Sequence, residues 1–402
     1  MKVTAIETVR VGARPNILWT QVHTDAGLTG LGETFYGSHA AEAHVHQTIA
    51  PYLIGKDPRN IEGHQSHLTG YVGFTGAGAE TRGRSAIDIA LWDLFGKSLG
   101  LPLVDLLGGR VRDSIRVYNT CAGYSYVQTR PTQGTDNFGL DAKQGPYEDL
   151  KGFLERADEV SLSLLEMGID AMKIWPFDYA AEASQGQWLS TADLKRGLEP
   201  FEKIRSAVGD RIDVMCELHG LWNRPQAVKI ARALEPFEPM WIEDPVIMDH
   251  MDAIGEVARS TRAPIAVGET RGMAADFKYL FDLNALSLVI MDIAWCGGVS
   301  EARKIATTAQ TYKVPVAFHD CTGPVVLATA THLALHVQNC PIQEIVRAFY
   351  HGWYGDVTVG LPPVKAGRIT VNESPGHGVS LHPELDARDG VHRRTTTAKD
   401  LG

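Results

Sequence analysis

Apolar and polar positions divide the chain into two regions with different patterns. The first region alternates between apolar and polar residues, as β-strands do, and then changes to helical spacing. The strands are expected at 2–11, at 17–24 and, after a turn at 25–28, up to Glu33, and the helices at 39–53 and 84–99. A sheet followed by helices is typical of an α+β module. We expect this module to span residues 1–112.

From about residue 114, short apolar runs alternate with longer helical stretches. Eight such units predict a closed parallel (β/α) barrel in the style of the TIM barrel, over residues 113–351. The expected strands are Ile115–Thr120, Ala171–Ile174, Asp213–Glu217, Trp241–Glu243, Ile265–Glu269, Leu288–Asp292, Val316–His319 and Ile342–Glu344. After the barrel, the turns and short strands within about 352–395 are expected to complete the first module. The fold class is therefore α/β, with an α+β domain at the N-terminus.

Two glycine-containing segments predict loops. Residues 125–150 are rich in Gly, Thr, Gln and Pro and predict a long loop after the first barrel strand. Residues 70–79 carry four glycines and two aromatic residues. Their flexibility suits a lid over a site, and their composition suits a plain connector equally well.

Polar residues recur at the ends of six successive barrel strands. They are Glu217, Glu243, Glu269, Asp292, His319 and Glu344, separated by 26, 26, 23, 27 and 25 residues. One βα unit has about this length, so each residue takes the same place in its unit, at the C-terminal face where barrel enzymes carry their active sites. Any one of them alone would suit a helix cap or a surface carboxylate. Six in register indicate a site.

The first three of these residues, Glu217, Glu243 and Glu269, are expected to bind one divalent metal ion. Carboxylates on adjacent strand ends converge, and in a partly buried site their repulsion amounts to several kcal/mol. A cation is needed to keep them ionised. An all-oxygen set favours Mg²⁺, with Mn²⁺ as a possible substitute, and the absence of a His or Cys triad argues against zinc.

Two further polar residues are expected to face the same end of the barrel. Period-two alternation from Glu217 puts His219 on the inward face, which favours a catalytic role over a structural one. The same alternation turns Met172 and Ile174 outward and Lys173 inward, where an ammonium group must be paired. Lys173 is either catalytic or a structural counter-ion to the barrel carboxylates.

Asp292 and His319 lie at neighbouring strand ends. A carboxylate in this position can orient an imidazole and raise its basicity, which predicts a general base. The alternative is a hydrogen-bonded pair with a purely structural role.

Composition and charge exclude several classes of protein. With 44% apolar and 21% charged residues, the 402-residue chain resembles an ordinary globular protein. Its net charge of −10 and the lack of a Lys/Arg-rich block argue against a nucleic-acid partner. No run of 18 apolar residues and no leader-like start are found, so no membrane association and a cytoplasmic location are expected. Five cysteines without a CxxC pair indicate reduced thiols.

Motifs in both regions of the chain point to a known family. Asp25–Glu33, Ala86–Lys97 and Leu106–Gly109 resemble the N-terminal capping domain of the enolase superfamily, and Trp241–Pro245 with Gly268–Thr270 resemble its second and third metal ligands. The resemblance covers nearly the whole chain and is specific to the mandelate racemase-like branch. It implies Mg²⁺ at three strand-end carboxylates and removal of the proton α to a substrate carboxylate, which gives an enediolate.

Within this branch, the sequence is most similar to the acid-sugar dehydratases, of which galactonate dehydratase is an example. The segments Glu217–Gly220, His319–Pro324 and Ile342–Glu344 carry this similarity. Glu217 stands where the dehydratases usually have Asp. Trp175 stands where racemases have the second Lys of a Lys-x-Lys pair, which counts against proton transfer through a Lys/His pair.

The resulting hypothesis is the dehydration of a sugar acid to a 2-keto-3-deoxy acid. His319, oriented by Asp292, would remove the α-proton, and His219 would protonate the departing β-hydroxyl. Lys173 and Glu344 would stabilise the enediolate oxygens. Whether Lys173 or His219 is the acid stays open.

Two other functions fit the same residues. A racemase, epimerase or cycloisomerase would use His319 with Lys173 on the same kind of enediolate, and a binding protein would have kept the barrel without turnover. Substrate contacts are expected from Lys173, Glu344, Trp175, Asn119 and Tyr124, and from the loops at 12–19 and 70–84. A homo-oligomer is expected.

Overall fold

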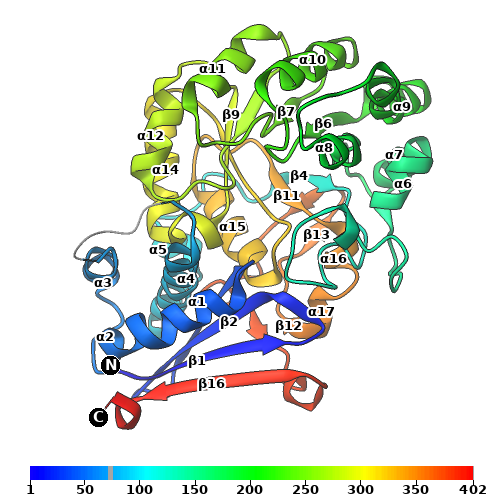
Figure 1. Cartoon of the computed structure of the whole chain (residues 1–402). Helices are drawn as coiled ribbons and strands as arrows, with labels where there is room; N and C mark the ends of the chain where they lie inside the picture. Colours follow the sequence, from blue (N-terminus) through cyan, green and yellow to red (C-terminus); the bar gives the residue numbers. More distant parts are fainter. Residues whose placement is uncertain (71–75, 402) are drawn as a thin grey trace.

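A four-stranded antiparallel sheet forms one end of the molecule in the computed structural model, which describes residues 1–70 and 76–401 (Figure 1). The strand order is β16-β1-β2-β3. The bounds are β1 Val3–Val11, β2 Arg14–Thr24, β3 Thr29–Phe35 and β16 Val391–Thr397. The first three strands match the sequence pattern. β16 was not predicted, because four successive residues from His392 to Thr395 are exposed and give no apolar alternation.

Helices cover this sheet on one side. Their bounds are α1 Ser38–His44, α2 Ala50–Leu53, α3 Ile61–Leu68, α4 Ala79–Leu99 and α5 Leu103–Leu106, and a π-helical turn, η1 Val45–Ile49, joins α1 to α2. The predicted helix at 39–53 is thus one continuous helical segment, whereas α3 was missed. α4 lies against β3 so closely that a Cβ on Gly32 would stand 1.8 Å from the Ala86 carbonyl oxygen. Only glycine permits this approach.

Eight parallel strands form the barrel, and all eight were predicted. They are β4 Ile115–Thr120, β5 Ala171–Ile174, β6 Asp213–Glu217, β7 Trp241–Glu243, β8 Ile265–Val267, β9 Leu288–Met291, β10 Val316–Phe318 and β11 Gln343–Ile345. Each strand from β4 to β9 pairs with the next one along the chain, and β11 pairs with β4. The Gln343 amide donates to the Phe318 carbonyl at 3.2 Å and so links β11 to β10. The predicted α/β class with an N-terminal α+β domain is confirmed.

Helices surround the barrel strands (Figure 1). They are α6 Asp149–Glu155, α7 Ala157–Glu166, α8 Asp178–Ser184, α9 Thr191–Val208, α10 Arg224–Leu234, α11 Met251–Ser260, α12 Ala274–Asp282, α13 Ile293–Cys296, α14 Gly298–Thr311, α15 Pro324–His336, α16 Arg347–Tyr350 and α17 Tyr354–Val357. Among the described helices, none is both long and apolar enough to cross a membrane.

Further short elements lie in the connections of the barrel and in the segment after α17. The strands are β12 Thr358–Val359, β13 Val364–Lys365, β14 Arg368–Ile369 and β15 Ser380–Leu381, and the 3-10 turns are η2 Thr135–Asn137, η3 Gly209–Arg211, η4 Glu235–Phe237, η5 Leu385–Ala387 and η6 Ala398–Leu401. β14 pairs antiparallel with β4. The division of the chain at residues 112 and 351 stays a prediction.

The predicted loop after the first barrel strand runs over residues 121–148, and we call it the β4–α6 loop. Asn137 organises it, since its amide donates to the carbonyls of Arg130 and Thr132 at 3.0 and 2.6 Å. Glu182 on α8 accepts the Thr135 N–H at 2.8 Å and anchors the loop to the barrel. In the glycine-rich segment predicted as a lid or connector, residues 71–75 lie outside the described part of the chain.

Candidate active site

Three buried glutamates meet at the C-terminal ends of β6, β7 and β8. Glu217 pairs in register with Glu243, and Glu269 follows β8 after Gly268. One carboxylate oxygen from each lies within 4.8 Å of the others, and the residues are only 1%, 0% and 7% exposed. Burial and the charge of Glu217 raise the pKa of Glu243 to about 8. This crowded all-oxygen set fits a hard divalent cation, which would hold all three carboxylates ionised.

Lys173 lies beneath these carboxylates in the barrel interior. Its ammonium nitrogen is 2.6 Å from Glu243 Oε1, 3.1 Å from Glu344 Oε1 and 3.4 Å from Glu217 Oε2. Burial alone would lower its pKa, but the charges of Glu243 and Glu344 raise it well above the ordinary value. Lys173 is therefore a cation fixed by three ion pairs.

Glu344 is held by contacts on both of its oxygens. Oε1 accepts the Thr120 hydroxyl, and Oε2 accepts the Asp320 N–H at 2.9 Å. Burial would raise the pKa of this carboxyl, but Lys173 and His319 outweigh it and lower the pKa. An ionised, immobile carboxylate results.

His319 is oriented by Asp292, as its place at the neighbouring strand end predicts. Its Nδ1 lies 2.7 Å from Asp292 Oδ2, and its Nε2 lies 3.3 Å from Glu269 Oε2. Asp292 is itself fixed, because its other oxygen accepts the Ala294 N–H at 2.7 Å. Burial would lower the pKa of His319, but Glu269 and other nearby carboxylates raise it well above the ordinary value.

His219 reaches the site by a different route from the one predicted. β6 ends at Glu217, and His219 lies beyond it with a left-handed φ of 50°, so the strand alternation does not extend this far. Its N–H donates to Glu217 Oε1 at 2.7 Å, which fixes this turn. Its Nδ1 lies 2.8 Å from Asp178 Oδ2. Burial would lower the pKa of His219, but Asp178 and Glu217 raise it to about 10.

One cavity is bordered by both histidines, by Lys173 and by two of the three glutamates. It is lined by Tyr36, Thr120, Tyr126, Gln133, Lys173, Trp175, Glu217, His219, Glu269, Trp295, His319 and Cys321. Tyr36 comes from the N-terminal domain, whereas Tyr126 and Gln133 come from the β4–α6 loop. The site is thus closed from two sides by segments outside the barrel strands.

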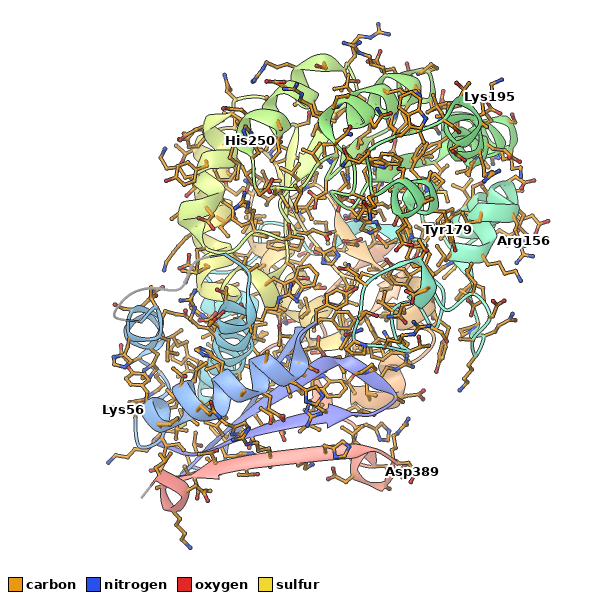
Figure 2. All side chains as sticks on the ribbon, in the orientation of Figure 1. Lys56, Arg156, Tyr179, Lys195, His250 and Asp389 are labelled. Atoms are coloured by element: carbon orange, nitrogen blue, oxygen red, sulfur yellow. The ribbon has the colours of Figure 1, made fainter. Side chains whose placement is uncertain are left out.

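A second hollow continues from this cavity toward the surface. The two share Tyr126, Gln133, His219 and Glu269, and the second extends to Thr135, Phe138 and Glu182. Tyr179 on α8, labelled in Figure 2, contacts Phe138 edge to face with ring centroids 5.7 Å apart.

Two residues that the sequence suggested as substrate contacts lie outside the cavity. Asn119 is fully buried, donates to Asp149 Oδ2 at 3.0 Å and accepts the Arg347 N–H at 2.8 Å. The strand alternation explains this, because Thr120 faces Glu344 and its neighbour Asn119 faces the surrounding helices. Tyr124 lines a different groove, whereas Trp175 does line the cavity.

Several residues of the site had no signal in the sequence. Asp178 contacts a histidine 41 positions away, and Tyr36, Tyr126 and Gln133 come from loops without a regular period. Trp295 follows Asp292 by one helical turn, a spacing that could have suggested it. Its ring lies 5.2 Å from that of His319.

Comparisons with known proteins agree with this geometry. Residues 3–108 match the N-terminal domain of mandelate racemase and muconate lactonizing enzyme, and residues 155–385 match the enolase C-terminal domain-like family. A crystal structure of an enolase of the mandelate racemase subgroup from Agrobacterium tumefaciens is 48% identical over the full length of both chains, with a TM-score of 0.89.

Relatives with assigned names include dehydratases. A D-galactonate dehydratase from Ralstonia nicotianae is 31% identical over 100% of this chain and 96% of its own, and a D-xylonate dehydratase from Haloferax volcanii is 28% identical over 96% and 88%. The resemblance seen in the sequence motifs is confirmed. The chain belongs to the mandelate racemase branch of the enolase superfamily, among its sugar-acid dehydratases, which are hydro-lyases.

Proposed function

We propose that this protein is a Mg²⁺-dependent dehydratase that converts a sugar acid to a 2-keto-3-deoxy acid. The observation that carries the proposal is a pair of histidines that line one cavity, each held by its own carboxylate. His319 is paired with Asp292 and His219 with Asp178. Dehydration needs one group that takes a proton and one that gives a proton.

The glutamates provide the place for the metal. Glu217, Glu243 and Glu269 would hold Mg²⁺, which supplies positive charge for the substrate carboxylate and offsets the charge of Glu269 beside His319. Lys173 adds a fixed positive charge at the same end of the barrel. Together these charges favour the electron-rich enediolate over the starting acid.

His319 would begin the reaction by accepting the α-proton at Nε2. Asp292 holds Nδ1, so Nε2 is the nitrogen directed to the cavity side, toward Glu269. The electron pair of the broken C–H bond moves into the substrate carboxylate. Glu344, immobilised beside Lys173, fixes that ammonium group near the developing charge.

His219 would complete the elimination. The enediolate electrons return to form a carbon–carbon double bond, the bond from the β-carbon to its hydroxyl breaks, and the His219 imidazolium gives that hydroxyl a proton, which releases water. The resulting enol tautomerises to the 2-keto-3-deoxy acid. The raised pKa of His219 supports its role as the proton donor.

The geometry favours this reaction over an epimerisation through Lys173. Lys173 is engaged by three carboxylates, and Trp175 occupies the position where a second lysine would support a Lys/His pair. The relatives act on D-galactonate and D-xylonate, so monocarboxylic aldonates are the substrate class that we propose.

A screen of aldonates with the purified protein and MgCl₂ tests the proposal. We expect at least one aldonate to give a 2-keto-3-deoxy acid, detected as its semicarbazone, and we expect EDTA to stop the reaction. Running the screen in D₂O separates the alternatives. Deuterium at the α-carbon without loss of water would instead establish an epimerase, and inactivity with every aldonate would contradict the proposal.

A further inference from the structure

A single helical turn joins the carboxylate that orients His319 to a tryptophan. α13 follows β9 directly, and its N-cap residue is Asp292, whose side chain accepts the Ala294 N–H at 2.7 Å. The Asp292 carbonyl accepts the N–H groups of Trp295 and Cys296 at 3.1 and 2.8 Å. These bonds close the turn, so Asp292 and Trp295 are held in one short, rigid unit.

The Trp295 indole also contacts the histidine itself. Its ring centroid lies 5.2 Å from that of His319, and the two ring planes are inclined by 39°. Both residues line the active-site cavity and are almost fully buried. The turn therefore touches His319 at two places, because Asp292 holds Nδ1 and Trp295 packs against the ring.

Two reciprocal hydrogen bonds tie this turn to the end of β3 in the N-terminal domain. The Thr34 hydroxyl donates to the Ala294 carbonyl at 3.0 Å, and the Trp295 indole N–H donates to the Phe35 carbonyl at 3.0 Å. All four residues are buried. A side chain from each part of the chain thus binds the backbone of the other, which fixes the position of α13 against β3.

Arg82 on α4 strengthens the same junction. Its Nη1 donates to the Phe35 carbonyl at 2.9 Å, and its guanidinium lies 4.7 Å from the Trp295 ring centroid. The Phe35 carbonyl thus accepts from two side chains, which occupies both of its lone pairs. The cation over the indole face adds an electrostatic attraction. Packing of an apolar core needs none of these polar contacts, so their concentration at one turn points to a need for fixed placement.

We propose that Trp295 is a positioning residue for His319, which links the position of the N-terminal domain to that of the base. The proposal rests on the role of His319 in the proposed reaction. Trp295 takes no part in the proton transfer and holds the imidazole in the orientation that directs Nε2 to the cavity. Loosening Trp295 should therefore slow the chemical step and leave substrate binding nearly unchanged.

Steady-state kinetics with the best aldonate of the screen test this role. Trp295→Phe keeps an aromatic ring and removes the N–H that binds the Phe35 carbonyl. We expect it to lower kcat by about 10–100-fold and to change KM by less than about twofold, because a displacement of about 1 Å costs up to about 10²-fold. Trp188→Phe is the matched control and should retain full kcat, since Trp188 is 67% exposed on the surface after α8.

Thr34→Val tests the junction from the other side. It keeps the shape of the side chain and removes the reciprocal bond, so we expect kcat to fall by about 2–10-fold, as for the loss of one hydrogen bond. The double variant should be no slower than Trp295→Phe alone, because both substitutions release the same turn. Additive losses would overturn the proposal. Thr311→Val, which removes an exposed hydroxyl bonded to the Thr307 carbonyl on α14, is the control.

A readout without turnover separates this proposal from the proposed reaction. Diethyl pyrocarbonate acylates imidazole nitrogens, and peptide mass spectrometry follows the acylation of His319 in the protein with MgCl₂ and without substrate. We expect His319 to react at least about twofold faster in Trp295→Phe and Thr34→Val than in the unsubstituted protein and both controls, because one hydrogen bond is lost in each. Failure of every aldonate to react would contradict the dehydratase alone, and the acylation rates would still decide the positioning role.

Three further results would overturn the positioning role. A rise in KM at constant kcat would show that Trp295 contacts the substrate. An unchanged kcat together with a lower urea midpoint would make Trp295 a packing residue only. Unchanged acylation of His319 in both variants would mean that the imidazole is held without Trp295. If circular dichroism shows that Trp295→Phe does not fold, Thr34→Val and its control decide.

Discussion

Single residues divide the proposed chemistry between a base and an acid. His319 and His219 both carry a carboxylate on Nδ1, so each imidazole presents Nε2 to the cavity side. Their neighbours differ, because Nε2 of His319 lies beside the metal-site residue Glu269, whereas His219 packs against Trp175 with ring centroids 5.8 Å apart. This difference assigns the two roles, and each can be tested separately.

Replacing His219 should separate proton removal from loss of water. We expect His219→Asn to lower the rate of 2-keto-3-deoxy acid formation by about 10²–10⁴-fold, because the departing hydroxyl loses its proton donor. Exchange of the substrate α-proton with D₂O should continue, since His319 is intact. His392→Asn, at an exposed position on β16, is the matched control and should retain full activity. Equal loss of exchange and dehydration would contradict this assignment.

Asp178 should act through His219 and not on the substrate. We expect Asp178→Asn to lower kcat while KM changes little, because the imidazolium loses the carboxylate 2.8 Å away that stabilises its charge. Steady-state kinetics with the best aldonate of the screen give both constants. A rise in KM at constant kcat would show instead that Asp178 contacts the substrate.

At the scale of elements, the barrel strands were predictable and the loops around them were not. Each strand is a short apolar run that ends in a polar residue, and the regular length of a βα unit placed Glu217, Glu243 and Glu269 together. Part of the cavity wall comes from loops, and contacts such as that of Asp178, the first residue of α8, with His219 follow no period in the sequence. Asn119 was predicted to contact the substrate, but it faces the surrounding helices. Neighbouring residues of β4 point to opposite faces, so a shift of one residue in the assignment moves a side chain from the inner to the outer face.

The contact between β3 and α4 can be tested by adding one methyl group. A Cβ on Gly32 would overlap the Ala86 carbonyl, so we expect Gly32→Ala to lower the free energy of unfolding by about 1–3 kcal/mol or more. Gly355→Ala is the control, because nothing lies within 4 Å of its Cβ and its φ is not positive. Urea unfolding compares the two variants. Similar midpoints for both would mean that α4 can shift away from the sheet without loss.

For the whole molecule, Glu33 links the N-terminal domain to the barrel. Its carboxylate accepts the Trp19 indole N–H at 2.6 Å and the Val326 N–H of α15 at 2.9 Å. Burial raises the pKa of this carboxyl to about 8. The folded protein therefore keeps this proton at a pH where the unfolded chain has already lost it.

The stability of the protein should consequently depend on pH through Glu33. The proton on Glu33 contributes fully to the free energy of unfolding below about pH 4.5, which is the ordinary pKa of a glutamate. This contribution is lost as the pH rises toward 8. Glu33→Gln should flatten the decrease of the unfolding free energy between pH 5 and pH 8 relative to the unsubstituted protein. Urea titrations at several pH values measure both slopes, and parallel slopes would refute a buried, protonated Glu33.

The pairing of β16 with β1 has a consequence for how the protein is made. Arg393 forms an ion pair with Glu7, 386 positions earlier, so β1 gains this partner only after β16 has been synthesised. Contacts between such distant segments form slowly, and the barrel can fold during synthesis before its cover is complete. The nascent chain thus exposes the edge of β1 until β16 has been synthesised. A stop codon or a fusion partner near residue 390 disturbs only a short segment of the chain. It should nevertheless reduce the yield of soluble protein strongly.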